Sequence, residues 1–218
     1  MGVVSPVLRT LTTRVADALP NIDDLSDENI AAIMLTYGTI VGENFIPWLS
    51  STWTRCRSSV AREACRTNLR DEIIEDHPQM LRTFLSPVEI YRERPYVVSA
   101  VNKAVQDARR EPGGVIAQIR RFTESADGVS GVWVLGALET TSCAFISWMD
   151  AAANRLSLAD RVYLEKHGEA DIMHADQFAA AVEAEASERH VLLTSDDPSD
   201  YPPLAAVHRL LDLIFHAA

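Results

Sequence analysis

The sequence predicts an all-α protein, built as one helical bundle of about seven or eight helices over residues 1–218. Apolar residues recur every three or four positions through nearly the whole chain, which is typical of amphipathic helices. No segment alternates apolar and polar residues for long enough to require a β-strand. Apolar residues make up 47% of the 218 positions, which is enough for a buried core at this length.

The first helices begin at recognisable signals. Ser5 can cap a helix, and Pro6 at the first helical position lacks an amide that would have had no partner anyway. Ser26 opens the second helix in the same way. The spacing of apolar residues predicts the others. The main expected helices cover 5–19, 26–41, 47–76, 96–109, 115–124, 128–154, 157–188 and 203–218, with a short one at 80–85.

Two of these helices carry further expectations. The long helix over 47–76 contains Cys56 and Cys65, whose nine-residue separation places them on opposite sides, so no disulfide is expected between them. His77-Pro78 ends this helix, because the residue before a proline is pushed out of helical geometry. The helix over 128–154 is the most apolar of the chain, and we expect it in the middle of the bundle.

Charge and composition narrow the class of function. The chain has 31 acidic and 20 basic side chains, and its net charge of −11 would repel the phosphates of nucleic acids and of anionic membranes. The first residues lack a secretory signal, and no apolar run approaches the roughly 18 residues of a membrane-spanning helix. Three cysteines without metal-ligand spacing predict reduced thiols. We therefore expect a cytoplasmic protein with neither nucleic-acid nor membrane partners.

The most specific pattern is His167, Asp171 and His174, at positions i, i+4 and i+7 of an expected helix. Their directions around the helix axis are about 0°, +40° and −20°, so two imidazoles and one carboxylate converge. This donor set suits iron, manganese or zinc. The alternative interpretation is a solvated polar stripe. Tyr163, one turn before His167, could hydrogen-bond a ligand or simply pack in the core.

Glu72 and His77 form a second candidate pair near the end of the long helix. Their five-residue spacing separates them by about 140° on an ideal helix. The pair can bind one ion only if the helix unwinds before Pro78. The alternative is an ordinary charged helix end.

Glu139 is the only charged residue between Gly128 and Asp150, inside the most apolar helix. Burying an unpaired carboxylate costs free energy or forces its protonation, and a metal ion offsets that cost. The alternative is an ion pair with Arg66 or Arg70. If metal is bound, six residues from three helices are enough for two ions: Glu72, His77, Glu139, His167, Asp171 and His174.

These motifs resemble those of the haem-oxygenase-like diiron oxidases, relatives of the TenA and PqqC families. The matching elements are Asn-Leu-x-Asp-Glu followed by His-Pro at residues 68–78, Glu139 after a turn of small residues, and His-x3-Asp-x2-His at residues 167–174. The resemblance covers roughly residues 40–190. It implies a haem-oxygenase-like bundle that dimerises in many relatives, so a homodimer is a further expectation.

The resemblance also implies an activity. Two Fe(II) ions held by the six residues would react with O2, and a peroxo-diiron(III) species would oxidise a small amino-acid-like or carboxylic substrate in specialised-metabolite biosynthesis. The metal centre, rather than a side chain, would carry the chemistry, and Arg66 or Arg70 could hold a substrate carboxylate. Two alternatives stay open. One is a metal-free enzyme of the TenA or PqqC kind that uses Glu and His as acids and bases, and the other is a non-catalytic helical binding module.

Overall fold

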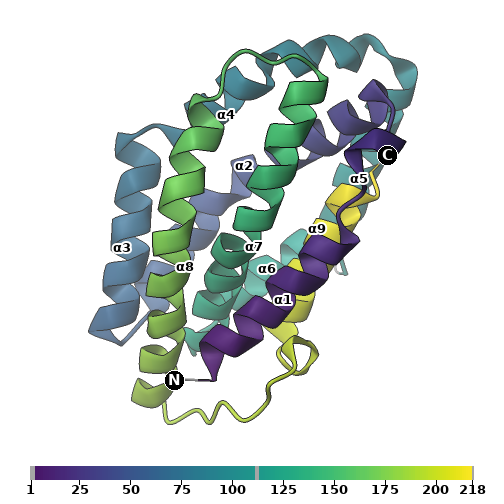
Figure 1. Cartoon of the computed structure of the whole chain (residues 1–218). Helices are drawn as coiled ribbons and strands as arrows, with labels where there is room; N and C mark the ends of the chain where they lie inside the picture. Colours follow the sequence, from purple (N-terminus) through teal and green to yellow (C-terminus); the bar gives the residue numbers. More distant parts are fainter. Residues whose placement is uncertain (1–2, 111–112, 218) are drawn as a thin grey trace.

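The computed structural model describes residues 3–110 and 113–217, and it confirms the all-α class. Within these ranges there are nine α-helices, as many as the helical segments expected from the sequence, together with three short 3-10 helices and no strand (Figure 1). The α-helices are α1 (Val4–Ala18), α2 (Asp27–Arg55), α3 (Ser59–Ile74), α4 (His77–Leu85), α5 (Pro95–Arg109), α6 (Val115–Thr123), α7 (Val129–Arg155), α8 (Val162–Glu188) and α9 (Pro202–Phe215). The 3-10 helices are η1 (Ile22–Asp24), η2 (Ser86–Glu93) and η3 (Pro198–Asp200).

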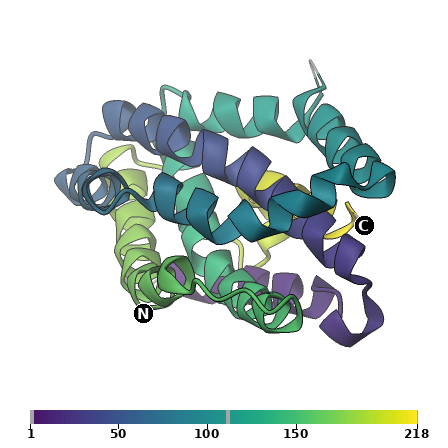
Figure 2. The same cartoon turned by 90° about the horizontal axis from the view of Figure 1, so that it is seen from above.

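The most apolar helix, α7, lies at the centre, as its sequence predicts. It packs most extensively against α8 and also contacts α1, α6 and α9. Figure 1 shows α3, α8 and α7 side by side, with α1 and α9 running obliquely past α7. Seen from above, α1 lies on one side of the bundle and the α5–α6 segment on the other (Figure 2). The α3–α8–α7 layer is the part of the fold that positions the candidate site.

The expectation of one helix over residues 47–76 is wrong in its boundaries. Instead, α2 continues through Pro47 and ends at Arg55. A proline inside a helix removes one backbone hydrogen bond and disfavours the preceding turn. The buried side chains of Trp48 and Leu49 lie directly after it, and their packing offsets that loss. Tertiary packing therefore overrides the local stop signal.

The actual break falls at residues 56–58 and is built from side-chain caps. The Ser58 hydroxyl accepts hydrogen bonds from the amides of Val60 and Ala61 and so caps α3. The fully buried Glu185 carboxylate of α8 accepts the amides of Arg57 and Ser58, at 2.9 and 2.7 Å. Because these amides have partners, the chain can turn here inside the protein.

This break also changes the cysteine expectation. Cys56 is the residue after α2, whereas Cys65 lies in α3, so they do not share one helix. Both thiols are free and buried, and they lie close enough to hydrogen-bond. That hydrogen bond and burial together raise the pKa of Cys65 well above its ordinary value.

Glu185 organises a wider junction. Its carboxylate pairs with Arg189 at 3.0 Å, and that guanidinium also donates to the carbonyls of Arg55 and Ala126. Gly128 adopts a φ of 68°, and a Cβ there would lie 2.7 Å from a Glu185 carboxylate oxygen. Glycine is therefore required at this position, because it alone fits both the left-handed backbone and the close approach.

Two helices are long and apolar enough to cross a membrane by length and composition, which the sequence reading did not anticipate. They are α2 and α7, and the most apolar windows of these helices are 56% and 72% buried inside the protein. Their apolar side chains are largely used for internal packing. The fold is therefore compatible with a soluble protein.

Replacing Glu185 with glutamine should destabilise the fold. The amide cannot accept hydrogen bonds through both of its polar atoms, and it leaves Arg189 without its buried charge partner. We expect the free energy of unfolding to fall by about 2–4 kcal/mol, measured by urea denaturation. Glu183→Gln, on an exposed position of the same helix, should change it by less than about 0.5 kcal/mol. Equal effects of the two substitutions would contradict the role given to Glu185.

Candidate metal centre

The six predicted ligands lie in the interior on four helices rather than the three expected, because His77 begins a helix of its own. α3 carries Glu72, α4 begins with His77, α7 carries Glu139, and α8 carries the other three. The side chains form two groups, in each of which the ligand atoms lie within 4.8 Å of one another. The first group is Glu72, His77 and His167; the second is Glu139, Asp171 and His174. Each group has the composition of a divalent metal site.

In the first group, Nδ1 of His77 lies 3.0 Å from Oε1 of Glu72, and Nε2 of His167 lies 4.0 Å from the same oxygen. The two imidazole rings are tilted against each other, with centroids 4.5 Å apart. A carboxylate oxygen and two ring nitrogens from three helices thus face a common point.

A helix break makes this group possible, as the five-residue spacing requires. α3 ends at Ile74, and Asp76 adopts left-handed backbone angles, with φ 54° and ψ 47°. α4 then starts at His77 in a new direction, with Pro78 in its first turn. The break turns the His77 imidazole back toward Glu72, which an uninterrupted helix would not allow.

In the second group, Nδ1 of His174 lies 3.6 Å from Oε2 of Glu139. The Ser142 hydroxyl donates to Oδ2 of Asp171 at 2.6 Å, and the Asn68 amide donates to Oε1 of Glu139. Each carboxylate therefore has one oxygen oriented by a neutral donor. Such outer hydrogen bonds are typical of ligating carboxylates.

The alternative in which an arginine neutralises Glu139 is not what the structure shows. Arg66 is exposed and pairs with Glu63 at 2.6 Å, and Arg70 is also exposed. The interpretation of the α8 residues as a solvated stripe fails as well, because Asp171 and His174 are each only 3% exposed.

In each of the three histidines, one ring nitrogen faces the other ligands of its group, and the second ring nitrogen faces a residue outside the group. Nδ1 of His167 lies 3.0 Å from the carbonyl oxygen of Tyr163. Nε2 of His174 lies 3.3 Å from Oδ2 of Asp71. Nε2 of His77 lies 3.6 Å from Glu75. An outer acceptor fixes the ring orientation and the tautomer of a metal-binding histidine.

The electrostatics of the groups follow from burial and crowding. Burial, and then the charge of Glu139, raises the pKa of Asp171 to about 8. Burial alone would lower the pKa of His174, but the hydrogen bond and charge of Glu139 raise it to about 9. Burial lowers the pKa of His167 to about 4, so this imidazole is neutral near pH 7 and keeps a lone pair for a ligand.

The residues fit a pair of divalent ions on chemical grounds. Three carboxylates are each less than a tenth exposed, and no lysine or arginine of the described chain forms an ion pair with them. Buried carboxylates need charge compensation. The two groups could therefore hold metal ions, and members of both line one cavity.

The chain matches no protein-family model and no curated protein sequence. The functional assignment therefore rests on these residues and their geometry.

Sequence reasoning left several contributors unassigned. For Asp71 the sequence left open whether it is solvated or lies behind a ligand, and the structure places it at the outer nitrogen of His174. Ser142 lies three residues after Glu139 on α7, a spacing that could have indicated it. Tyr37 had no signal, because its contact with Tyr163 joins α2 to α8 across 126 positions. Tyr163 is 3% exposed, and its ring packs on His167 with centroids 4.1 Å apart.

Asp71 provides a direct test of the outer contacts. Asp71→Asn can turn an amide N–H toward Nε2 of His174, which disfavours the tautomer that leaves Nδ1 free for a metal. We expect the affinity of the second group for Zn(II), a redox-inert probe, to fall about 10–100-fold. A competition titration against a chromophoric chelator measures this. Asp176→Asn, an exposed change on α8, should bind as the unmodified chain does, and an equally unaffected Asp71→Asn would rule out the positioning role.

Proposed function

We propose that the chain is an O2-dependent non-haem diiron oxidase or oxygenase of the haem-oxygenase-like kind, acting on a small molecule. The observation that carries the proposal is the pair of buried ligand groups, each with at least one carboxylate and one imidazole, opening on one cavity. Carboxylate and imidazole together are a donor set that iron accepts. Zinc and manganese share this preference, so the metal's identity is part of the proposal.

Two Fe(II) ions, when bound, would supply the electrons that O2 requires for an oxidation. The chain's own residues hold and orient the site. Asn68 and Ser142 fix the carboxylates of α7 and α8, and Asp71 fixes His174. The apolar packing of α7 and α8 keeps bulk water away from the ligands, which protects a reactive centre from side reactions.

The remaining parts of the proposal concern the localisation, the metabolic role, the substrate and the oligomeric state. We infer a cytoplasmic protein, supported by the free thiols of all three cysteines. A role in specialised-metabolite biosynthesis, a carboxylic or amino-acid-like substrate and a homodimeric state come from the family resemblance. Of these three properties, the cavity gives information only about the substrate. Arg66 and Arg70 are exposed and do not line the cavity, which disfavours the expectation that they bind a substrate carboxylate.

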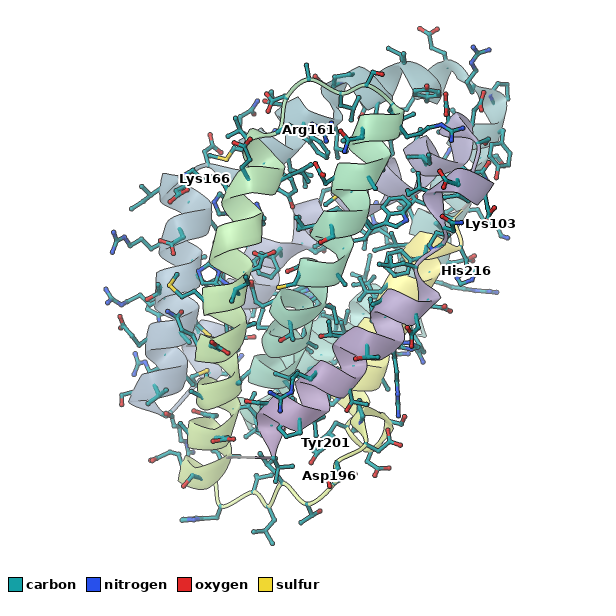
Figure 3. The ribbon with its side chains drawn as sticks, in the orientation of Figure 1. Lys103, Arg161, Lys166, Asp196, Tyr201 and His216 are labelled. Atoms are coloured by element: carbon teal, nitrogen blue, oxygen red, sulfur yellow. The ribbon has the colours of Figure 1, made fainter. Side chains whose placement is uncertain are left out.

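Metal loading tests the proposal directly. The protein is incubated anaerobically with Fe(II), freed of excess metal and then exposed to O2. We expect about two iron ions per chain and a magnetically coupled pair in the Mössbauer spectrum. His174→Ala should retain about one iron and lose the coupling, because the second group then has only two ligands. His216→Ala is the matched control, since this exposed histidine lies near the end of α9, far from α8 (Figure 3).

The outcomes separate the competing functions. Wild-type protein that binds no iron would rule out the diiron proposal. Turnover that persists fully in the presence of a chelator would favour the metal-free acid–base enzyme instead.

A further inference from the structure

The cavity beside the two ligand groups has an apolar wall. Apart from the ligands, most of its lining is contributed by aliphatic and aromatic side chains. They include Val41, Phe45, Ile46, Leu81, Leu138 and Phe145. Among the described lining residues there is no lysine and no arginine. A charged group pressed against this wall would lose its hydration without gaining a partner.

Two tyrosines supply the polar feature of this wall. Tyr37 of α2 and Tyr163 of α8 both line the cavity, and their hydroxyl oxygens lie 3.4 Å apart. Ring contacts hold them in place: Tyr37 packs against Phe145 at 4.5 Å, and Tyr163 stacks on Phe84 at 5.8 Å. Their hydroxyls are therefore fixed relative to the ligand groups.

The two tyrosine hydroxyls together have one more hydrogen-bond donor than their mutual contact uses. Each phenol carries one hydrogen near neutral pH, because the ordinary pKa of a tyrosine is about 10. The contact between the two hydroxyls uses one hydrogen and leaves the other without an acceptor among the residues that the structure describes. A buried donor without an acceptor is costly, and a ligand in the cavity can supply the acceptor.

The other hydroxyls of the lining are already engaged. The Thr141 hydroxyl donates to the Ala137 carbonyl at 2.6 Å. The Ser142 hydroxyl lies 2.6 Å from Asp171 and 2.7 Å from the Glu139 carbonyl. The tyrosine pair is thus the place in the wall where a ligand finds a neutral donor.

We propose that the substrate body held in this cavity is apolar and uncharged and carries an oxygen acceptor, such as a carbonyl, ether or hydroxyl oxygen, that accepts a hydrogen bond from the Tyr37–Tyr163 pair. This inference rests on the proposed function, since it names the substrate class of the same site. It narrows the amino-acid-like expectation for the substrate: once bound metal ions compensate the three ligand carboxylates, the apolar residues of the wall offer a free ammonium or carboxylate no counter-charge.

Matched neutral probes test the inference. Acetophenone and ethylbenzene have nearly the same shape, and only acetophenone carries an acceptor oxygen; benzylammonium adds a charge. Dissociation constants are measured by ligand-detected NMR on the Zn(II)-loaded chain and on the chelator-treated chain. We expect acetophenone to bind about three- to tenfold more tightly than ethylbenzene. On the Zn(II)-loaded chain, where metal compensates the ligand carboxylates, we expect benzylammonium to bind more weakly than both.

The double variant Tyr37→Phe/Tyr163→Phe keeps the apolar shape and removes both hydroxyls. We expect acetophenone and ethylbenzene to bind this variant with about equal dissociation constants, and the dissociation constant of ethylbenzene to stay unchanged. Tyr96→Phe is the control, because this exposed tyrosine of α5 lies outside the cavity, and it should keep the full preference. Circular dichroism and thermal melting identify a variant that does not fold, in which case the single variants Tyr37→Phe and Tyr163→Phe are compared instead.

Failure of this inference can be told apart from failure of the proposed function. Metal titration decides the function, whereas the probe ratio decides the substrate class. Equal binding of acetophenone and ethylbenzene, a preference that survives in the double variant, tight binding of benzylammonium to the Zn(II)-loaded chain, or no binding of any probe would each overturn the inference, even in a chain that binds two metal ions.

Discussion

The burial of three carboxylates on adjoining helices is the constraint on which the rest of the structure depends. Glu72, Glu139 and Asp171 are drawn from α3, α7 and α8 into a space that no lysine or arginine of the described chain enters. The effective penalty for an uncompensated buried ion is several kcal/mol. Imidazoles, neutral amide and hydroxyl donors and a raised pKa at Asp171 lessen it within the protein. Bound cations would complete the compensation, so the helices that make the core also define the candidate centre.

Irregular backbone, rather than regular helix, places the ligands. The left-handed Asp76 separates α3 from α4 and returns His77 toward Glu72. The neighbouring residues Asp71 and Glu72 point to different groups, Asp71 to His174 and Glu72 to His77. One turn of α3 therefore couples the two ligand groups. Any shift of α3 along α8 would disturb both at once, which makes the α3–α8 packing part of the site.

The sequence predicted the parts of this site that depend on local geometry. His167, Asp171 and His174 share a face because helical periodicity alone requires it. They do not converge on one point as expected: His167 joins Glu72 and His77, whereas Asp171 and His174 join Glu139. A break before Pro78 is present as predicted, but its position and cause differ: it lies at Glu75 and Asp76, and His77 itself begins α4. The break at residues 56–58 was missed, because it depends on Glu185, which lies about 128 positions away. The Tyr37–Tyr163 contact is equally non-local. Pattern reasoning reaches neighbours along a helix, whereas packing decides which helices meet.

The charge balance of the centre explains why carboxylates also surround it. Two divalent ions would bring one positive charge more than the three ligand carboxylates cancel. Asp71 lies behind His174, and Glu75 lies behind His77. Glu75 is in turn paired with Lys166 at 3.1 Å, on the part of α8 labelled in Figure 3. The outer acids therefore compensate the excess charge through the imidazoles without occupying the cavity. This arrangement leaves the apolar wall free for an uncharged substrate body, because the outer acids Asp71 and Glu75 do not line the cavity.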